Sequence, residues 1–227
     1  MIETSGAPAR PVVTYTLIGA CCLVFVLGPA SGLHPGYGTG DALLRARAGH
    51  FAHWGVVPDD LWHGSRSAAL SPLTALFVHG NWVHLLGNLL FLQVFGGMAE
   101  QRMGRVQFAL FYLATGYLAL LGYAAAHAGS TESLVGASGA VSGVLGAFLW
   151  LFPRARVTSL FPFLFFLPLR FPAWLVLVFW FVLQGLAAGQ AGDRPGVAHL
   201  AHLIGFVLGF LFAWARFGRP DPAGAAG

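Results

Sequence analysis

The feature that most constrains this chain is a series of long apolar stretches that are nearly free of charge. They occupy residues 12–28, 82–99, 106–126, 138–152, 171–189 and 197–216. An apolar helix of about 20 residues spans a bilayer core of about 30 Å. Only 9% of the 227 residues are charged, whereas soluble domains carry about 25%. The sequence therefore predicts an all-α membrane protein with six transmembrane helices.

The segments outside these stretches divide the chain further. We expect a cytoplasmic tail over 1–11, one membrane domain over 12–216 and a disordered Gly/Ala/Pro tail over 217–227. The longest loop, 29–78, contains Trp54 and Trp62, and tryptophan favours the membrane interface. We expect this loop to pack at the bilayer surface, and its detailed fold stays open.

The apolar stretch 157–170 contains Pro162 and Pro168. Proline removes a backbone hydrogen bond from a helix, so we expect an irregular or interfacial segment that leads into the fifth span.

The arginines predict the orientation of the chain in the membrane. One set of loops holds Arg10, Arg102, Arg105, Arg154, Arg156, Arg216 and Arg219, and the other set holds Arg45, Arg47, Arg66 and Arg194; Arg170 fits either set. The positive-inside rule places the first set, and both termini, in the cytoplasm. An alternative interpretation is that the first span is a cleaved signal peptide, which would leave five spans and an external N-terminus. The net charge of +4 fits orientation better than nucleic-acid binding, because the chain has no basic run.

Polar residues gather at the N-terminal ends of the second, fourth and sixth spans. The three segments read “HGNWVHLLGN” with His79, His84 and Asn88, “GASG” with Ser138, and “AHLAHLIGFVLG” with His199 and His202. All three ends lie on the outer side in the predicted topology. Polar groups inside a membrane are costly unless they are paired, so they are candidates for a functional site.

Small residues predict which spans pack closely. Gly205 and Gly209 share one helix face with His202, and a small-residue face runs along the fourth span through Ser138, Ser142 and Gly146, flanked by Gly139 and Gly143. Small residues let membrane helices approach closely. Packing of these two faces would bring Ser138 and His202 together.

This combination predicts acyl-transfer chemistry. Serine is a weak nucleophile that needs an adjacent base, and histidine suits that role because its protonation changes near neutral pH. The backbone N–H of Ser138 at the helix start, with the side chains of His84 and Asn88, would supply donors for an oxyanion. The spans contain no aspartate to orient the histidine, so the expected site is a Ser138–His202 dyad. His199 lies nearer the loop and is expected to be solvated or to contact the loop.

Other classes of function fit less well. A proton-coupled transporter using His84, His199 and His202 would need a mid-span carboxylate or an inverted repeat. A metalloprotease would need a motif such as His-Glu-x-x-His, which is absent from the sequence. We therefore expect no metal site.

Taken together, “HGNWVHLLGN”, “GASG” and “AHLIGFVLG”, in this order, with “GGMAEQRMG” after the second span, resemble the bacterial rhomboid intramembrane serine proteases. The similarity covers about residues 70–215. It implies a six-helix fold in the bacterial inner membrane, cleavage of transmembrane segments of other proteins, and no cofactor. By position, Ser138 matches the nucleophile, His202 the base, and His84 and Asn88 the oxyanion residues. Gly136 and Gly139 would let the chain and substrate approach the serine, and Gly205 and Gly209 match the packing glycines.

The sequence departs from the family pattern at two points. Many members carry an aromatic residue four positions after the nucleophile, where this chain has Ser142, so what holds the His202 ring stays open. The first loop lacks an adjacent Trp-Arg pair, since Trp62 and Arg66 are four positions apart. A proteolytically inactive relative that binds client transmembrane helices is the alternative function.

Overall fold

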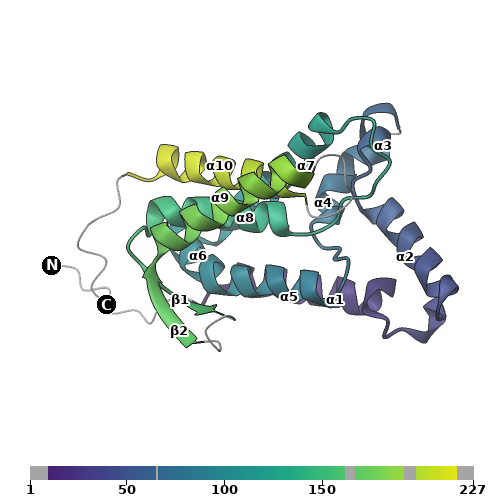
Figure 1. Cartoon of the computed structure of the whole chain (residues 1–227), viewed down its shortest axis with the longest axis horizontal. Coiled ribbons are helices and arrows are strands. Elements are labelled where there is room, and N and C mark those ends of the chain that lie inside the picture. Colours follow the sequence, from purple (N-terminus) through teal and green to yellow (C-terminus); the bar gives the residue numbers. More distant parts are fainter. Residues whose placement is uncertain (1–9, 65, 162–166, 192–197, 219–227) are drawn as a thin grey trace.

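The computed structural model describes residues 10–64, 66–161, 167–191 and 198–218. Most of the two predicted tails, and most of the loop after the fifth apolar stretch, lie outside these residues. The described chain is a helical bundle with one small β-hairpin at its side (Figure 1). The predicted all-α class is confirmed.

Helix α8, Ser138–Leu151, forms the centre of the bundle, and nearly all of its residues are buried. It packs against α10 (His199–Arg216), α7 (Arg105–Ala126) and α9 (Ala173–Ala191). Its sequence, rich in glycine and alanine, allows neighbouring helices to approach from several sides. The short predicted fourth span is thus a helix enclosed by protein.

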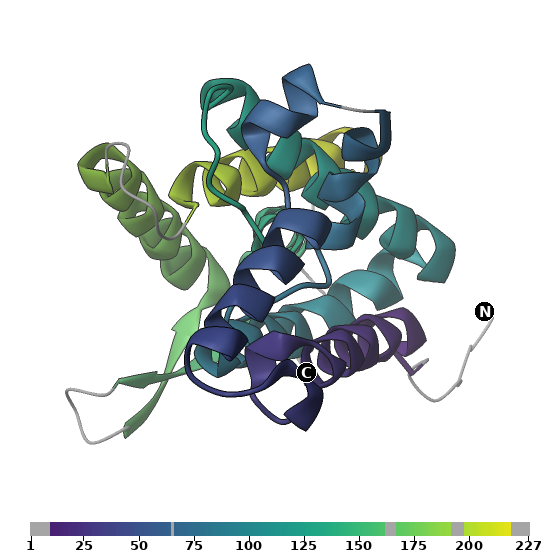
Figure 2. The same ribbon diagram turned by 90° about the vertical axis from the view of Figure 1, so that its right-hand side faces the viewer.

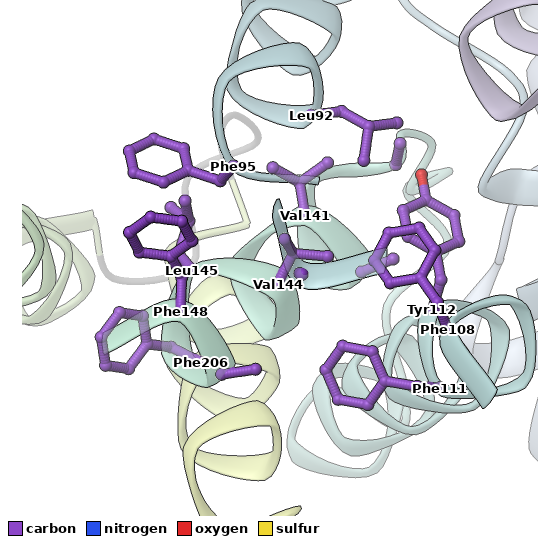
Figure 3. Close-up of a cluster of buried hydrophobic side chains, with 14 of the residues drawn as sticks. Leu92, Phe95, Phe108, Phe111, Tyr112, Val141, Val144, Leu145, Phe148 and Phe206 are labelled. Carbon is purple, nitrogen blue, oxygen red and sulfur yellow. The ribbon is translucent and has the colours of Figure 1, made fainter. Parts of the chain in front are cut away.

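The apolar core forms where α8 meets its neighbours. Figure 3 shows Val141, Val144, Leu145 and Phe148 of α8 among aromatic side chains of the surrounding helices. Phe95 meets Phe148 edge to face, with ring centroids 4.9 Å apart. This core fixes the helix against which the candidate site is built.

The second apolar stretch is helical throughout but not uniform. It consists of α5 (Trp82–Phe91), a π-helical turn η4 (Leu92–Gly96) and α6 (Gly97–Met103). The Asn81 side chain caps α5 by accepting a hydrogen bond from the backbone N–H of His84 at 2.8 Å. A π turn inserts an extra residue and rotates the rest of the helix about its axis, which the apolar pattern over 82–99 did not predict.

Helix α1, Val12–Leu27, is held by a carboxylate from a distant part of the chain. The buried Glu100 of α6 accepts hydrogen bonds from the backbone N–H groups of Val13 and Thr14, at 3.0 and 2.8 Å, and from the Thr14 hydroxyl at 2.8 Å. A negative charge is favourable at a helix N-terminus, where the first N–H groups lack partners within the helix.

The long loop that the sequence left open is mostly helical. Its elements are η1 (Pro29–Ser31), η2 (Pro35–Tyr37), α2 (Asp41–Trp54), α3 (Pro58–His63), η3 (Arg66–Leu70) and α4 (Ser71–Ala75). It is tied to the bundle by the Trp62 indole, which donates to the carbonyl of Ala124 at 3.0 Å. A backbone bridge between Val56 and Leu134 provides a second attachment.

The segment before the fifth apolar stretch corrects one prediction. An irregular or interfacial segment was expected over 157–170, but β1 (Arg156–Phe161) pairs antiparallel with β2 (Leu167–Pro172). Both strands of a two-stranded ribbon are edge strands, and an edge tolerates proline because its N–H position faces outward. In Figure 2 this hairpin projects from the side of the bundle below α9.

Three described helical stretches are long and apolar enough to cross a membrane: Trp82–Met103, Arg105–Ala126 and His199–Arg216. Three shorter apolar helices, Val12–Leu27, Ser138–Leu151 and Ala173–Gly189, complete the bundle. All six coincide with the predicted apolar spans to within a few residues.

Candidate active site

Helices α8 and α10 approach each other so closely that their backbones touch. A Cβ atom placed on Gly205 would contact the carbonyl group of Gly139, and one placed on Gly209 would contact that of Gly143. One turn further along, a Cβ on Gly146 would contact the carbonyl of Phe206. The flanking glycines of α8 therefore take part directly in the contact, together with Gly146. Only glycine permits this separation.

This contact sets the level of the two candidate catalytic residues. Ser138 immediately precedes Gly139, and His202 lies one helical turn before Gly205. Both residues therefore lie at the same end of one closely packed helix pair. Ser138 is partly exposed and His202 is buried.

Ser138 occupies the first position of α8. Its backbone N–H is one of those at a helix start that have no acceptor within the helix. Its carbonyl accepts a hydrogen bond from the Ser142 hydroxyl at 2.6 Å. The Ser142 hydroxyl is thus engaged with its own helix.

Gly136 shapes the chain just before the serine. Its φ of 128° lies in a region that favours glycine, and its N–H donates to the carbonyl of Ala75 at 2.9 Å. A Cβ on Gly136 would lie 2.7 Å from Cε1 and Nε2 of the His84 ring and 3.8 Å from the hydroxyl of Ser138. The imidazole of His84 therefore occupies the space that a side chain at position 136 would need, next to Ser138.

His84 and Asn88 lie on one face of α5, one turn apart. The Asn88 amide nitrogen donates to the carbonyl of His84 at 2.9 Å. An amide nitrogen carries two hydrogens, so a second donor position is available on this buried side chain.

Two residues of α9 hold the His202 ring. The Gln184 side-chain oxygen lies 2.8 Å from Nδ1 of His202, and the Trp180 ring lies beside the imidazole with centroids 6.1 Å apart. Sequence reasoning missed both residues. The available signal was a single glutamine in an otherwise apolar stretch, since polar groups within membranes are usually paired.

His199 makes a contact that the sequence did not predict. It was expected to be solvated or to contact the loop, but its Nδ1 lies 2.8 Å from the same Gln184 oxygen. The reason is tertiary, because α9 packs against the first turns of α10 and presents an acceptor there.

His79 is a further residue of this region. It is buried, its ring centroid lies 5.3 Å from that of His84, and its Nδ1 lies 3.3 Å from the carbonyl of Phe77. Burial, reinforced by the neighbouring His84, lowers the pKa of His79 to about 4, so this side chain is neutral near pH 7. Its Nε2 has no hydrogen-bond partner among the described residues.

Two arrangements do not occur within the described residues. No hydrogen bond joins the hydroxyl of Ser138 to His202; catalytic hydrogen bonds are often long without substrate and shorten when it binds. No group of three His, Cys, Asp or Glu side chains is placed to hold a metal ion there. The groups that remain are a hydroxyl, imidazoles, amides and a helix start, which is a set suited to acyl transfer.

Apolar helices of spanning length around a buried polar cluster define an integral membrane protein. A profile of the Rhomboid domain matches residues 66–219, and the chain belongs to the rhomboid family.

Named relatives agree with this assignment. RHOMBOID-like protein 6, mitochondrial, of Arabidopsis thaliana is 28% identical over 67% of this chain and 48% of its own length. Rhomboid protein 1, mitochondrial, of Saccharomyces cerevisiae is 32% identical over 65% of this chain and 42% of its own. Rhomboid protease GlpG of Haemophilus influenzae is 31% identical over 60% of this chain and 64% of its own length. The chain thus aligns with less than two thirds of the length of each of these relatives.

Proposed function

We propose that this chain is an intramembrane serine endopeptidase with Ser138 as nucleophile and His202 as general base. The observation that carries the proposal is the contact between Gly139 and Gly205. It supports placing Ser138 and His202 at a similar depth, at one end of the α8–α10 pair. The His84 ring beside Gly136, close to Ser138, would add a further donor. The similarity to a relative named a protease supports the same reaction.

The chemistry derives from these positions. The Ser138 oxygen bonds to the substrate carbonyl carbon while its proton passes to Nε2 of His202. The carbonyl electron pair moves to oxygen, and the backbone N–H of Ser138 with donors from His84 and Asn88 stabilises that charge. The C–N bond then breaks as His202 returns the proton to the leaving amine. Water attacks the acyl-serine, gives a proton to His202, and serine leaves with that proton.

The substrates in this proposal are transmembrane segments of other proteins. The membrane domain, 12–216, lies in the bacterial inner membrane with both termini in the cytoplasm, so the site faces the outer side. Peptide bonds in an intact helix are shielded by their neighbours. We therefore expect cuts near the outer face, at small residues where glycine or proline weakens the helix. Mass spectrometry of the products locates the cut, and cuts consistently at the cytoplasmic end would contradict the orientation.

The direct test compares wild type with Ser138→Ala in detergent. A fluorophosphonate probe should label the wild-type protein and not the variant, and only wild type should cleave a transmembrane test substrate containing glycine or proline. Loss of one hydroxyl from this partly exposed position should leave the fold intact, which thermal unfolding checks. Cleavage by pure Ser138→Ala would reject the nucleophile. A folded wild type that neither reacts nor cleaves, yet binds transmembrane peptides, would favour an inactive client-binding relative.

The two histidines of α10 give a second test. His202→Ala should reduce turnover about as much as Ser138→Ala, because members of a dyad act as a unit and base catalysis contributes about 10²- to 10⁴-fold. His199→Ala should keep most of the activity. Turnover of one substrate by the three variants, at equal folded concentration, makes the comparison. An inactive His199→Ala together with an active His202→Ala would show that the base is His199, one turn away, and not His202.

A further inference from the structure

Gln184 is the polar side chain that α9 directs at the two histidines of α10. Its single side-chain oxygen lies 2.8 Å from Nδ1 of His202 and 2.8 Å from Nδ1 of His199. The two imidazole rings are nearly perpendicular, at 89°, with centroids 6.0 Å apart. One oxygen with two lone pairs can accept from two donors at once.

The chemistry of this contact fixes the position of a proton. An amide oxygen only accepts hydrogen bonds, so each Nδ1 must carry hydrogen. In a neutral imidazole the other nitrogen, Nε2, is then an acceptor. His202 in this tautomer has a free lone pair, as a base for Ser138 requires. If the amide were reversed, its nitrogen would face both Nδ1 atoms and donate hydrogen bonds to them. This would favour the tautomer with hydrogen on Nε2, in which Nε2 cannot act as a base.

We propose that Gln184 is a positioning residue that holds His202 in the Nδ1–H tautomer and takes the place of the acidic member of a serine protease triad. This inference rests on the proposed function, since it names what prepares the base of that same site. His199 supports it as a second donor to the same oxygen: turning the amide over would require both imidazoles to change tautomer instead of one.

The other groups facing His202 do not offer the same function. From α5, His84 is close enough to interact electrostatically. From α9, Trp180 provides a ring face, and α8 presents glycines and serines at this level. Within the described residues, neither a carboxylate nor an arginine is placed against the imidazole. The Nδ1 contact of His202 therefore depends on Gln184.

Three variants test the proposal. Gln184→Met keeps the length of the side chain and removes the acceptor. Gln184→Glu keeps an acceptor and adds charge. Gln107→Met makes the same change at another half-buried glutamine, in α7. Residue 107 lies 12 positions from Ala119, the α7 residue that a Cβ on Gly139 would approach most closely, and 12 positions are about 18 Å along a helix.

The kinetic result expected for a positioning residue is specific. Gln184→Met should lower kcat by about 10- to 100-fold, the range found when a partner that orients a metal-ligating histidine is removed, and should leave KM within about twofold. Gln184→Glu should recover much of the kcat that Gln184→Met loses. Its activity should rise at a higher pH than that of wild type, because a carboxylate favours the protonated, inactive imidazole. Gln107→Met should match wild type in both parameters.

A spectroscopic measurement separates this inference from the proposed function. Histidine ¹⁵N chemical shifts, assigned with His202→Ala, should report the Nδ1–H tautomer of His202 in wild type and in Gln107→Met, and a tautomer mixture in Gln184→Met. Wild-type kcat or an unchanged tautomer in Gln184→Met would overturn the role of Gln184. Cleavage by Ser138→Ala would instead overturn the protease mechanism, and the tautomer result would still decide on Gln184.

Discussion

At the scale of single residues, Gly136 shows how one position controls the candidate site. Its backbone adopts a positive φ and leaves room for the His84 ring next to Ser138. A residue with a Cβ would be strained there, by about 1–2 kcal/mol for the left-handed region, and would also collide with an imidazole assigned to the oxyanion. Glycines therefore flank this serine for two reasons. Gly136, before it, leaves room for His84, and Gly139, after it, lets neighbouring helices approach closely.

Gly136→Ala tests this account. The added Cβ would lie 2.7 Å from two atoms of the His84 ring, so the ring must move. Displacements of about 1 Å in a catalytic group can cost about 10²-fold in rate. We expect turnover to fall by about that factor. The matched control is Gly87→Ala, in the same helix as His84, because a Cβ there would meet nothing within 4 Å. Equal turnover in the two variants would contradict the proposed role of His84.

At the scale of elements, the α8–α10 pair depends on backbone contact over more than one turn. Gly205 and Gly209 face the carbonyls of Gly139 and Gly143. Backbone carbonyls of a buried helix cannot move aside as a flexible side chain can, so the pair has no room for an added methyl group. Because this contact places Ser138 and His202 at the same end of the helix pair, the proposed chemistry depends on the packing of these two helices.

Gly209→Ala should destabilise the protein. Overpacking a filled interface costs about 1–3 kcal/mol, so the thermal midpoint in detergent should fall clearly below that of wild type. Gly185→Ala in α9 is the control, since a Cβ there would meet nothing within 4 Å, and alanine is the better helix former. A midpoint unchanged by Gly209→Ala would show that α8 and α10 do not pack this closely.

At the scale of the whole molecule, Glu100 joins the first helix to the rest of the bundle. Its carboxylate accepts hydrogen bonds from Val13 and Thr14, which lie 87 and 86 positions earlier in the sequence. It is 2% exposed, so water cannot replace these contacts. The N-terminal helix is thus fixed to α6 at one end by a capping interaction from outside its own sequence.

Glu100→Gln should loosen this attachment. The amide keeps the volume but turns one acceptor into a donor, which would face backbone N–H groups. Hydrogen bonds to a charged group are worth about 1.5–3 kcal/mol, and we expect a loss of stability of that order by thermal or denaturant unfolding. Glu132→Gln, at an exposed position, should leave stability unchanged. Equal stability of both variants and wild type would show that Glu100 does not anchor α1.

The sequence by itself determined the class of the fold and the positions of its apolar helices. Hydrophobicity over about 20 residues is a local property, so the segments now seen as α1, α7, α8 and α10 could be located without knowledge of their neighbours. The three polar motifs also singled out His84, Ser138 and His202 as candidates, because polar side chains stand out in apolar segments. These motifs carried the resemblance to the rhomboid family.

Only the tertiary structure decided which groups from different segments meet. Gln184 reaches the histidines because α9 packs against α10, Glu100 caps α1 across the bundle, and Pro168 lies in β2 of a two-stranded ribbon. Each of these depends on the depth and rotation of one element relative to another. If a helix shifts by one residue relative to its neighbour, the side that faces the neighbour changes by about 100°. The apolar pattern of the sequence is nearly the same for both positions. Helix packing, which joins residues far apart in the chain, selects one arrangement among those that the pattern allows.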